Sequence, residues 1–280
     1  MTVYASTNFI TSFDTLVKKQ YQGKMKLRGA VRVKTGVKGS THEFPLINKG
    51  IATPRIAQTD VTPMNVQHGK ATATLEDWNA ADYSDVYDLS KLNFDERQEL
   101  VDTATMAIGR RLDQLILDAM DAGANSTQVS DDLGGINSGL NIEKILRAKR
   151  LMDDQGVPND GRRHMAVSAY AVEQGLQEAE IASADYNLLM PLMKGEITDI
   201  SGFKIHVIES RDEGGLAVAA NIRKNFAWHQ DAVGLAVGLD MRTEVNYIAE
   251  KTSTLVNAIF SAGAVVIDDK GVYEVLTYEA

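Results

Sequence analysis

The sequence predicts an elongated α+β fold. Three observations lead to this prediction: a long helical stretch in the middle of the chain, a hairpin without a core of its own before it, and a strand-rich C-terminal part. Apolar residues three and four positions apart predict the helices, whereas alternating apolar residues predict the strands. A compact enzyme of 280 residues seldom needs such a long helix, so the pattern favours an extended, plate-like subunit.

The central helix is predicted over residues 93–123. Asn93 can cap its start, Glu96 can complete a capping box, and Gly123 can provide a left-handed turn at its end. At 1.5 Å per residue the helix is roughly 40 Å long. Its apolar stripe consists of Val101, Ala104, Ile108, Leu112, Leu115 and Ala119. We expect this stripe to pack on the C-terminal strands and the opposite face to remain available for a neighbouring subunit.

An arm and a hairpin precede the helix. Residues 1–25 predict a short amphipathic arm whose apolar face needs a partner. Residues 26–75 predict a two-stranded hairpin, with one strand over 27–34 and a returning strand over 42–46. The hairpin contains three of the five prolines and few large apolar residues. Because an isolated hairpin is marginally stable in water, we expect it to dock on another surface.

Two further groups of elements complete the chain. A strand at 71–75 and an acidic turn at Asp82, Asp85 and Asp88 lead into the helix, and residues 76–140 form one unit with it. Residues 141–222 predict a lobe containing a helix capped by Asn141, a buried strand, a helix capped by Ser168 and two short strands around a turn. Residues 223–280 predict return strands that pack with the helix. These strands are expected at 227–233, 241–248, 255–260, 264–267 and 272–278.

Charge is distributed unevenly along the chain. The net charge of −9 argues against a protein whose main task is to bind nucleic acid. Residues 1–75 hold eleven Lys and Arg against three Asp and Glu, whereas the remainder holds 18 against 35. The basic segment is either an ordinary surface or the part that docks on the acidic body of another copy. A third interpretation, an arm that binds nucleic acid, is less favoured because aromatic residues are not interleaved with the basic ones. The candidate interface residues are Arg28, Arg32, Lys34, Lys38, Lys49 and Arg55.

Motifs for catalysis, cofactors and metals are missing from the sequence. It contains no phosphate loop, dinucleotide fingerprint or nucleophile elbow, and no cysteine. The five histidines are not at metal-ligand spacing and are interpreted as unrelated. Ser168 is interpreted as a helix cap rather than a nucleophile, and the spaced aspartates as a solvated turn rather than a calcium loop. We therefore predict no catalytic, cofactor-binding or metal site, and no enzyme activity.

Two local patterns and the order of the elements resemble a known family. One pattern runs from Gly195-Glu196-Ile197 to Gly202-Phe203-Lys204-Ile205, and the other covers residues 225–236. In this order, after a long helix, they resemble major capsid proteins of tailed double-stranded-DNA bacteriophages, which share the Hong Kong phage-type fold. The resemblance implies an N-terminal arm (1–25), an E-loop (26–75), a P-domain (76–140 with return strands 223–280) whose spine helix is 93–123, and an A-domain (141–222).

The resemblance also implies a function and partners. We expect a structural subunit that assembles into hexamers and pentamers of an icosahedral head in the host cytoplasm. The head would enclose DNA without sequence-specific binding, without a membrane, and with the help of a separate scaffolding protein and a portal. Two alternatives remain: the shell protein of an encapsulin-like cellular nanocompartment, and an α+β enzyme. The first would carry cargo proteins, and the second would need a buried cluster of titratable residues.

Overall fold

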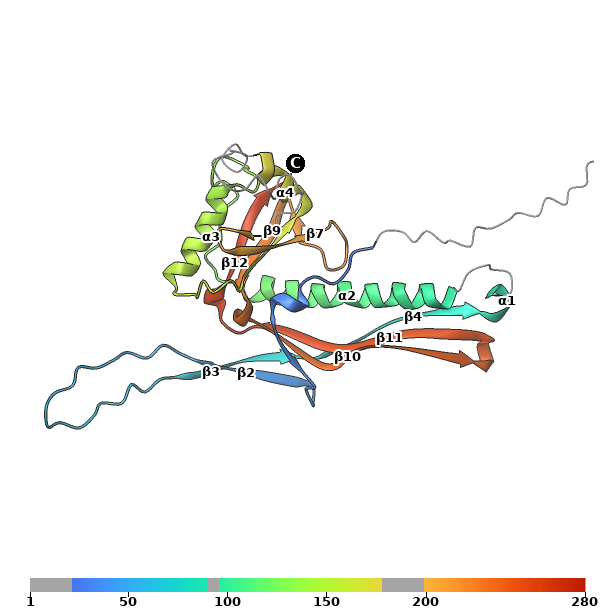
Figure 1. Cartoon of the computed structure of the whole chain (residues 1–280), viewed down its shortest axis with the longest axis horizontal. Coiled ribbons are helices and arrows are strands. Elements are labelled where there is room, and N and C mark those ends of the chain that lie inside the picture. The colour runs from blue at the N-terminus through green and yellow to red at the C-terminus, as the bar shows by residue number, and fades with distance from the viewer. Residues whose placement is uncertain (1–21, 90–95, 178–198, 280) are drawn as a thin grey trace, which may run out of the picture.

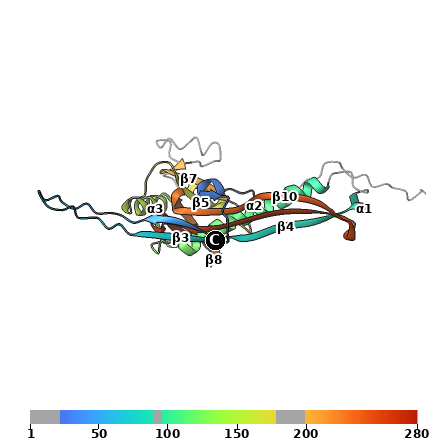
Figure 2. The same cartoon turned by 90° about the horizontal axis from the view of Figure 1, so that it is seen from below.

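The computed structural model describes residues 22–89, 96–177 and 199–279, and Figure 1 shows their arrangement. One long helix lies along a narrow sheet, a lobe rises over one end of the helix, and a hairpin projects beyond that same end. Figure 2 shows that the sheet and the hairpin are thin when seen edge-on. The molecule is therefore elongated and flat, as the length of the central helix predicts.

The central helix, α2, spans Glu96–Gly123 and buries one face along its C-terminal half. The apolar residues buried there are Ile108, Leu112, Ile116, Leu117 and Met120. Ile108 and Leu112 confirm the predicted stripe, whereas Leu115 and Ala119 are only half-buried. Asn93, the predicted cap, lies outside the described residues. The role predicted for Gly123 is wrong: its φ is not left-handed, and the glycine instead allows close approach to Val266.

The sheet under α2 has four strands in the order β1-β10-β11-β4. β10 (Val233–Ile248) and β11 (Ser253–Val266) form a long antiparallel pair, β4 (Glu76–Asp85) lies along β11, and β1 (Arg32–Thr35) runs parallel to β10. The sequence predicts three shorter strands for this pair, at 241–248, 255–260 and 264–267, where the structure has two long ones. Asp82 and Asp85 belong to β4 and not to a turn, and Asp88 belongs to the short helix α1 (Val86–Leu89).

The projecting hairpin consists of β2 (Thr41–Ile47) and β3 (His68–Thr74), which pair antiparallel. The predicted partner of residues 42–46 is therefore wrong. Only the second half of the strand predicted over 27–34 forms: Arg28–Ala30 is a 3₁₀ turn, and Arg32–Thr35 is β1, which joins the main sheet. A long connection separates β2 from β3 in the sequence. Local patterns therefore do not reveal that these two strands pair.

The lobe contains a second sheet with its main strands in the order β12-β9-β5-β7-β6. Their bounds are β5 Arg163–Ser168, β6 Asp199–Ile200, β7 Phe203–Ile208, β9 Ile222–His229 and β12 Val272–Tyr278, and β8 (Val218–Ala219) pairs with β9. Helices α3 (Ile142–Asp154) and α4 (Ala169–Gln177) belong to the same lobe. Residues 223–280 are thus not one group of return strands: β9 and β12 belong to the lobe, and β10 and β11 to the long sheet.

Two large hydrophobic clusters stabilise the two parts. The first lies between α2, the long sheet and the adjoining strands of the lobe, and includes Leu112, Ile116, Trp228 and Phe260. The second lies inside the lobe between α3, α4 and the second sheet. We call α2 and the long sheet together the rod. Because strands of the lobe contribute to the first cluster, the rod and the lobe share buried apolar surface. Among the described residues, no helix is both long enough and apolar enough to span a bilayer.

Candidate assembly surfaces and the Asp113 junction

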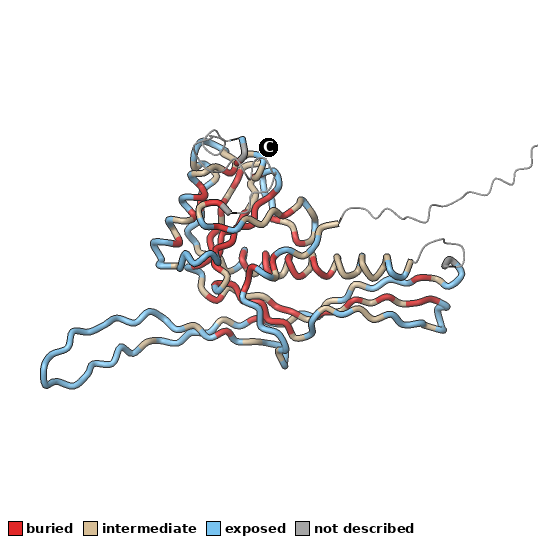
Figure 3. The backbone as a smooth tube through the Cα atoms, viewed as in Figure 1, coloured by how far each residue is buried: buried red, intermediate tan, exposed pale blue. Residues whose placement is uncertain are grey.

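The outer part of the hairpin is highly exposed. Residues 48–67, which connect β2 to β3, are almost entirely exposed and appear as a pale-blue extension in Figure 3. Several of them are large and apolar, including Ile51, which is 80% exposed, and Val61, which is 92% exposed. Apolar side chains held this far from the body of the molecule have no core of their own to join. They are therefore candidates for contact with another chain.

The base of the hairpin is fixed to the body. Phe44 on β2 is buried with Ala73, Ala236 and Ile267 in a small cluster of its own. A glycine at position 234 makes room for the Phe44 ring, whose nearest atoms lie 2.8 Å from where a β-carbon would be. At the start of the connection, the Lys49 Nζ donates a hydrogen bond of 3.0 Å to the carbonyl of Gln155, just after α3. The hairpin thus projects from an anchored base.

The six predicted interface residues differ in their contacts within the subunit. Arg28 donates two hydrogen bonds of 2.9 Å to Asp240 of the same chain, and Lys49 contacts Gln155. The Arg32 guanidinium lies 5.9 Å from the centre of the Phe44 ring. Arg32, Lys34, Lys38, Lys49 and Arg55 are all exposed, whereas Arg28 is half-buried. Arg28 therefore serves a contact within the subunit, and the other five cations lie on the surface.

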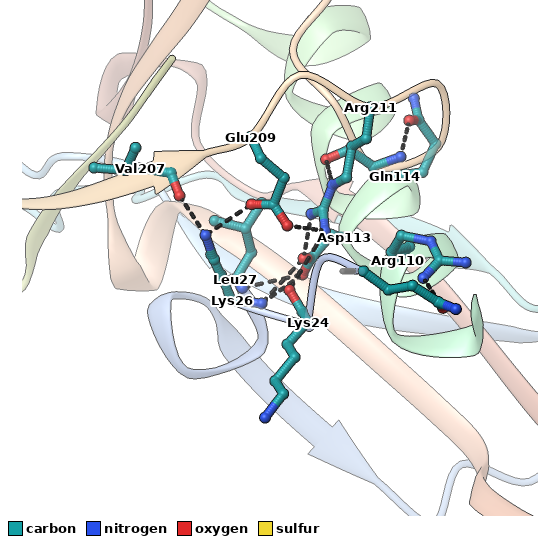
Figure 4. A network of polar contacts seen from close by, with 11 residues as sticks. Lys24, Lys26, Leu27, Arg110, Asp113, Gln114, Val207, Glu209 and Arg211 are labelled. Carbon is teal, nitrogen blue, oxygen red and sulfur yellow. Dashed lines mark hydrogen bonds and ion pairs between the residues drawn. The ribbon is translucent and has the colours of Figure 1, made fainter. Parts of the chain in front are cut away.

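A polar junction joins the start of the described chain to both the rod and the lobe (Figure 4). Asp113 lies on the buried face of α2, and its side chain is fully buried. Its carboxylate accepts hydrogen bonds from the backbone N–H of Lys26 at 3.0 Å and of Leu27 at 3.0 Å, and from Nη2 of Arg211 at 2.9 Å. We call these residues, together with Glu209, the Asp113 junction.

Further contacts connect the same three segments. The Lys26 Nζ donates to the carbonyl of Val207 and to the Glu209 carboxylate, each at 2.7 Å. Nη1 of Arg211 donates to the same carboxylate at 3.2 Å. Burial raises the pKa of the Asp113 carboxyl, while the two backbone donors and Arg211 oppose that effect. A buried carboxylate with three donors is stable only while all three remain in place.

Sequence reasoning missed the Asp113 junction, although one signal for it was present. Asp113 immediately follows Leu112 in the apolar stripe of the helix, where a charged residue is out of pattern. Its partners come from positions about ninety and one hundred residues away, so no spacing rule connects them. An acid on the buried face of a helix does predict that some partner exists.

A second polar cluster lies on the sheet of the lobe, and sequence reasoning missed it as well. Nδ1 of His164 on β5 lies 3.0 Å from Nε2 of His206 on β7, and both rings stack near Trp228. The parallel pairing of β5 with β7 brings these two histidines together across 42 positions in the chain. Burial, followed by repulsion from His206, Lys204 and His229, lowers the pKa of His164 to about 4. The interpretation of these two histidines as unrelated is therefore wrong.

The groups considered for catalysis have structural roles. Ser168 accepts a hydrogen bond of 2.9 Å from the N–H of Ala171 and donates to the carboxylate of Glu279, so it caps α4 as predicted. His229 contacts Asp160 at 3.1 Å at the edge of the lobe. Within residues 22–89, 96–177 and 199–279, no three His, Asp or Glu side chains are grouped as metal ligands.

Comparisons with known proteins identify the family. A family model described as "Phage capsid protein" matches residues 5–279. No curated protein matches. Among solved structures, the capsid of cyanophage P-SCSP1u is similar with 14% identity and a TM-score of 0.75, covering 98% of this chain and 94% of that one. The head structure of Helicobacter pylori bacteriophage KHP40 is similar with 12% identity and a TM-score of 0.78, covering 97% and 96%.

The comparisons agree with the architecture. Mycobacterium phage Che8 supplies a further similar structure, with 16% identity, a TM-score of 0.71, and coverage of 97% of this chain and 98% of that chain. These matches extend over the rod, the hairpin and the lobe, so the whole α+β fold is that of a phage capsid protein. Neither the nanocompartment nor the enzyme alternative is favoured. The chain belongs to the phage capsid protein family and is a structural major capsid subunit of a multi-subunit shell.

Proposed function

We propose that the subunit forms hexamers and pentamers of an icosahedral head and that its hairpin extends over a neighbouring copy. The single observation that carries this proposal is the hairpin of β2 and β3, anchored at Phe44 and exposed over residues 48–67. An apolar extension without a core of its own is stable in water only when another surface covers it. In a closed symmetric shell, every copy can give its hairpin and receive one.

A receiving surface is available on the long sheet. A groove of about 520 Å³ lies on the long sheet near its bulge. Its lining includes the apolar side chains of Val37, Leu75, Leu239 and Ile259. The exposed apolar residues of the hairpin connection, Ile51, Ile56, Val61 and Met64, have the chemistry that such a groove accepts. The proposal therefore pairs two apolar surfaces that are both uncovered in the single subunit.

The remaining parts of the proposed function concern partners and location. We propose that hairpin, helix α2 and lobe serve as E-loop, spine helix and A-domain, with the long sheet in the P-domain. The acidic character of residues 76–280 supports enclosure of DNA without sequence-specific binding, because acidic surfaces repel phosphate. A separate scaffolding protein and a portal would complete the head, which would be assembled in the host cytoplasm.

Shortening the hairpin tests the proposal. Asn48 donates its N–H to the carbonyl of Gln67 at 3.0 Å, so a two-residue Asn-Gly turn can replace residues 49–66 next to this last pair. We expect the shortened subunit to fold with a melting temperature close to that of the full chain, because the removed residues do not contribute to the clusters around α2 or inside the lobe. The one anchoring contact that is lost, from Lys49 to Gln155, is an exposed hydrogen bond and contributes little to stability. It should no longer form particles under conditions in which the full chain does.

The matched control retains the length of the hairpin. Ile51, Ile56, Val61 and Met64 are replaced by serine or threonine in the control, which preserves the connection but removes its apolar surface. If apolar contact drives docking, the control should also assemble poorly. Normal particles from the shortened chain would contradict the proposed role of the hairpin.

A further inference from the structure

The Asp113 junction has a geometry that simple packing of a helix on a sheet does not require. Residues 22–27 run between α2 and the segment 209–215 of the lobe, and they contact both (Figure 4). A β-carbon added to Gly23 would lie 1.8 Å from Oε1 of Glu209, and one added to Gly109 would lie 3.1 Å from Cβ of Met25. Glycine on the segment and on the helix thus permits this close passage.

The hydrogen bonds of the junction divide between its two sides. On the helix side, Asp113 accepts the N–H groups of Lys26 and Leu27. On the lobe side, the Lys26 Nζ donates to Val207 and Glu209, and Nη1 of Arg211 lies 3.4 Å from the carbonyl of Lys24. Arg211 also donates to Asp113 and so connects the two sides directly. Residues 24–27 therefore cannot leave the helix without disturbing the lobe contacts.

Contacts on either side of the junction extend it. Nη1 of Arg110 donates to Oε1 of Gln22 at 3.1 Å, one turn of α2 before Asp113. The N–H of Gly214 donates to Oε1 of Gln114 at 2.7 Å, on the residue that follows Asp113. Consecutive parts of one helix face thus hold the start of the described chain and the loop of the lobe side by side. Asp113 lies between them and contacts both.

We propose that Asp113 is a positioning residue that fixes the root of the N-terminal arm, and that through Arg211 it couples the position of this root to the position of the lobe. A neighbouring subunit that displaces the root of the arm then also displaces the lobe, and a displacement of the lobe moves the root of the arm. Coupling of this kind is reciprocal, because it is a free energy shared by two sites. Through the junction, a contact made at the root of the arm therefore affects the position of the lobe.

Hydrogen–deuterium exchange of the unassembled full chain tests the coupling. Three peptides report on it: residues 22–30 for the arm root, residues 207–216 for the lobe loop, and residues 254–262 of β11 as a reference. The Asp113→Asn variant replaces an acceptor oxygen with a donor, so at least one of the three donors loses its partner. We expect exchange in the first two peptides to become about tenfold faster or more, with the reference unchanged.

Two further variants make the result decisive. Asp60→Asn is the matched control, because it makes the same chemical change at an exposed position in the hairpin connection, outside the junction. It should leave all three peptides unchanged. Arg211→Met keeps the acceptor of Asp113 but removes the connection to the lobe, and it should also speed exchange in the 22–30 peptide. If Asp113→Asn fails to fold, Arg211→Met alone decides the question.

Several outcomes would overturn the proposal. Acceleration limited to the 22–30 peptide in both variants would show that the arm root is held but not coupled. Equal acceleration in the 254–262 reference would show that Asp113 supports only global stability. If neither variant changed the exchange rate of any peptide, Asp113 would have no positioning role. The exchange experiment uses the unassembled subunit, so its outcome is independent of the proposed docking of the hairpin.

Discussion

At the scale of single residues, the histidine pair beside Trp228 makes the stability of the subunit depend on pH. The pKa of His164 is lowered in the folded chain to about 4, below its ordinary value of 6.5. Between these two values the unfolded chain binds a proton that the folded chain does not. Stability is therefore complete above pH 6.5 and is lost as the pH falls toward 4. The loss is on the order of 3 kcal/mol over the whole window.

Urea denaturation of the unassembled chain at pH 7.5 and pH 5.0 measures this effect. We expect the free energy of unfolding to fall by roughly 2 kcal/mol more in the wild type than in His164→Gln, because the variant lacks the titrating group. His68→Gln is the control, since His68 lies on the exposed hairpin. A wild type and a His164→Gln variant with equal pH dependence would show that the pair does not titrate in this range.

Charge reversal separates the two kinds of basic residue. Lys34 and Lys38 are exposed, whereas Arg28 is paired with Asp240 within the chain. We expect Lys34→Glu with Lys38→Glu to weaken assembly at low salt and to have less effect at high salt, because salt screens exposed charges. Light scattering across a salt series measures this.

The control for charge reversal carries the same change of net charge on the lobe. Arg147→Glu with Arg150→Glu alters two exposed positions of α3, an element other than the one that carries Lys34 and Lys38. It should assemble as the wild type does. Equal assembly of all three proteins at every salt concentration would contradict a role for Lys34 and Lys38 in docking.

At the scale of elements, the end of α2 depends on the size of residue 123. A β-carbon at Gly123 would lie 2.7 Å from Cβ of Val266, so Gly123→Ala must push the helix away from β11. We expect a loss of roughly 1–3 kcal/mol in the free energy of unfolding, as for other overpacked sites. Gly29→Ala is the control, because no atom lies within 4 Å of its added carbon. A Gly123→Ala variant as stable as the Gly29→Ala variant would contradict this account of the close approach.

Elements that depend on neighbouring residues were predictable from the sequence. The cap of α3 forms as predicted, with the Asn141 side chain accepting from the N–H of Lys144, and Ser168 caps α4. The turn between β6 and β7 has φ of 53° at Ser201 and 88° at Gly202, as a tight hairpin turn requires. Each of these features is determined within four residues, so a local pattern is sufficient to find it.

Elements that depend on distant partners were not predictable in the same way. The stretch that becomes β1 alternates as a strand should, but its partner is β10, some two hundred residues later. The division of residues 223–280 between two sheets likewise depends on which strand lies beside β5. The Asp113 junction and the histidine pair form only when these long-range pairings are made. Their residues were visible in the sequence, but their partners were not.

At the scale of the whole molecule, shape and exposed surface fit a subunit that needs neighbours. The rod and the lobe share one buried cluster and form a body, while the hairpin leaves that body with its apolar side chains uncovered. A free monomer would keep both the hairpin and the groove at Leu239 in water. Assembly covers both, which gives the subunit a hydrophobic driving force for association in addition to any attraction of charges.

The most direct test is negative-stain electron microscopy of the expressed full chain, across a range of salt concentrations and with a scaffolding protein added. We expect closed icosahedral particles, or rings of six subunits, and neither from the chain with the shortened hairpin. A full chain that remains a dispersed monomer under every one of these conditions would contradict the account.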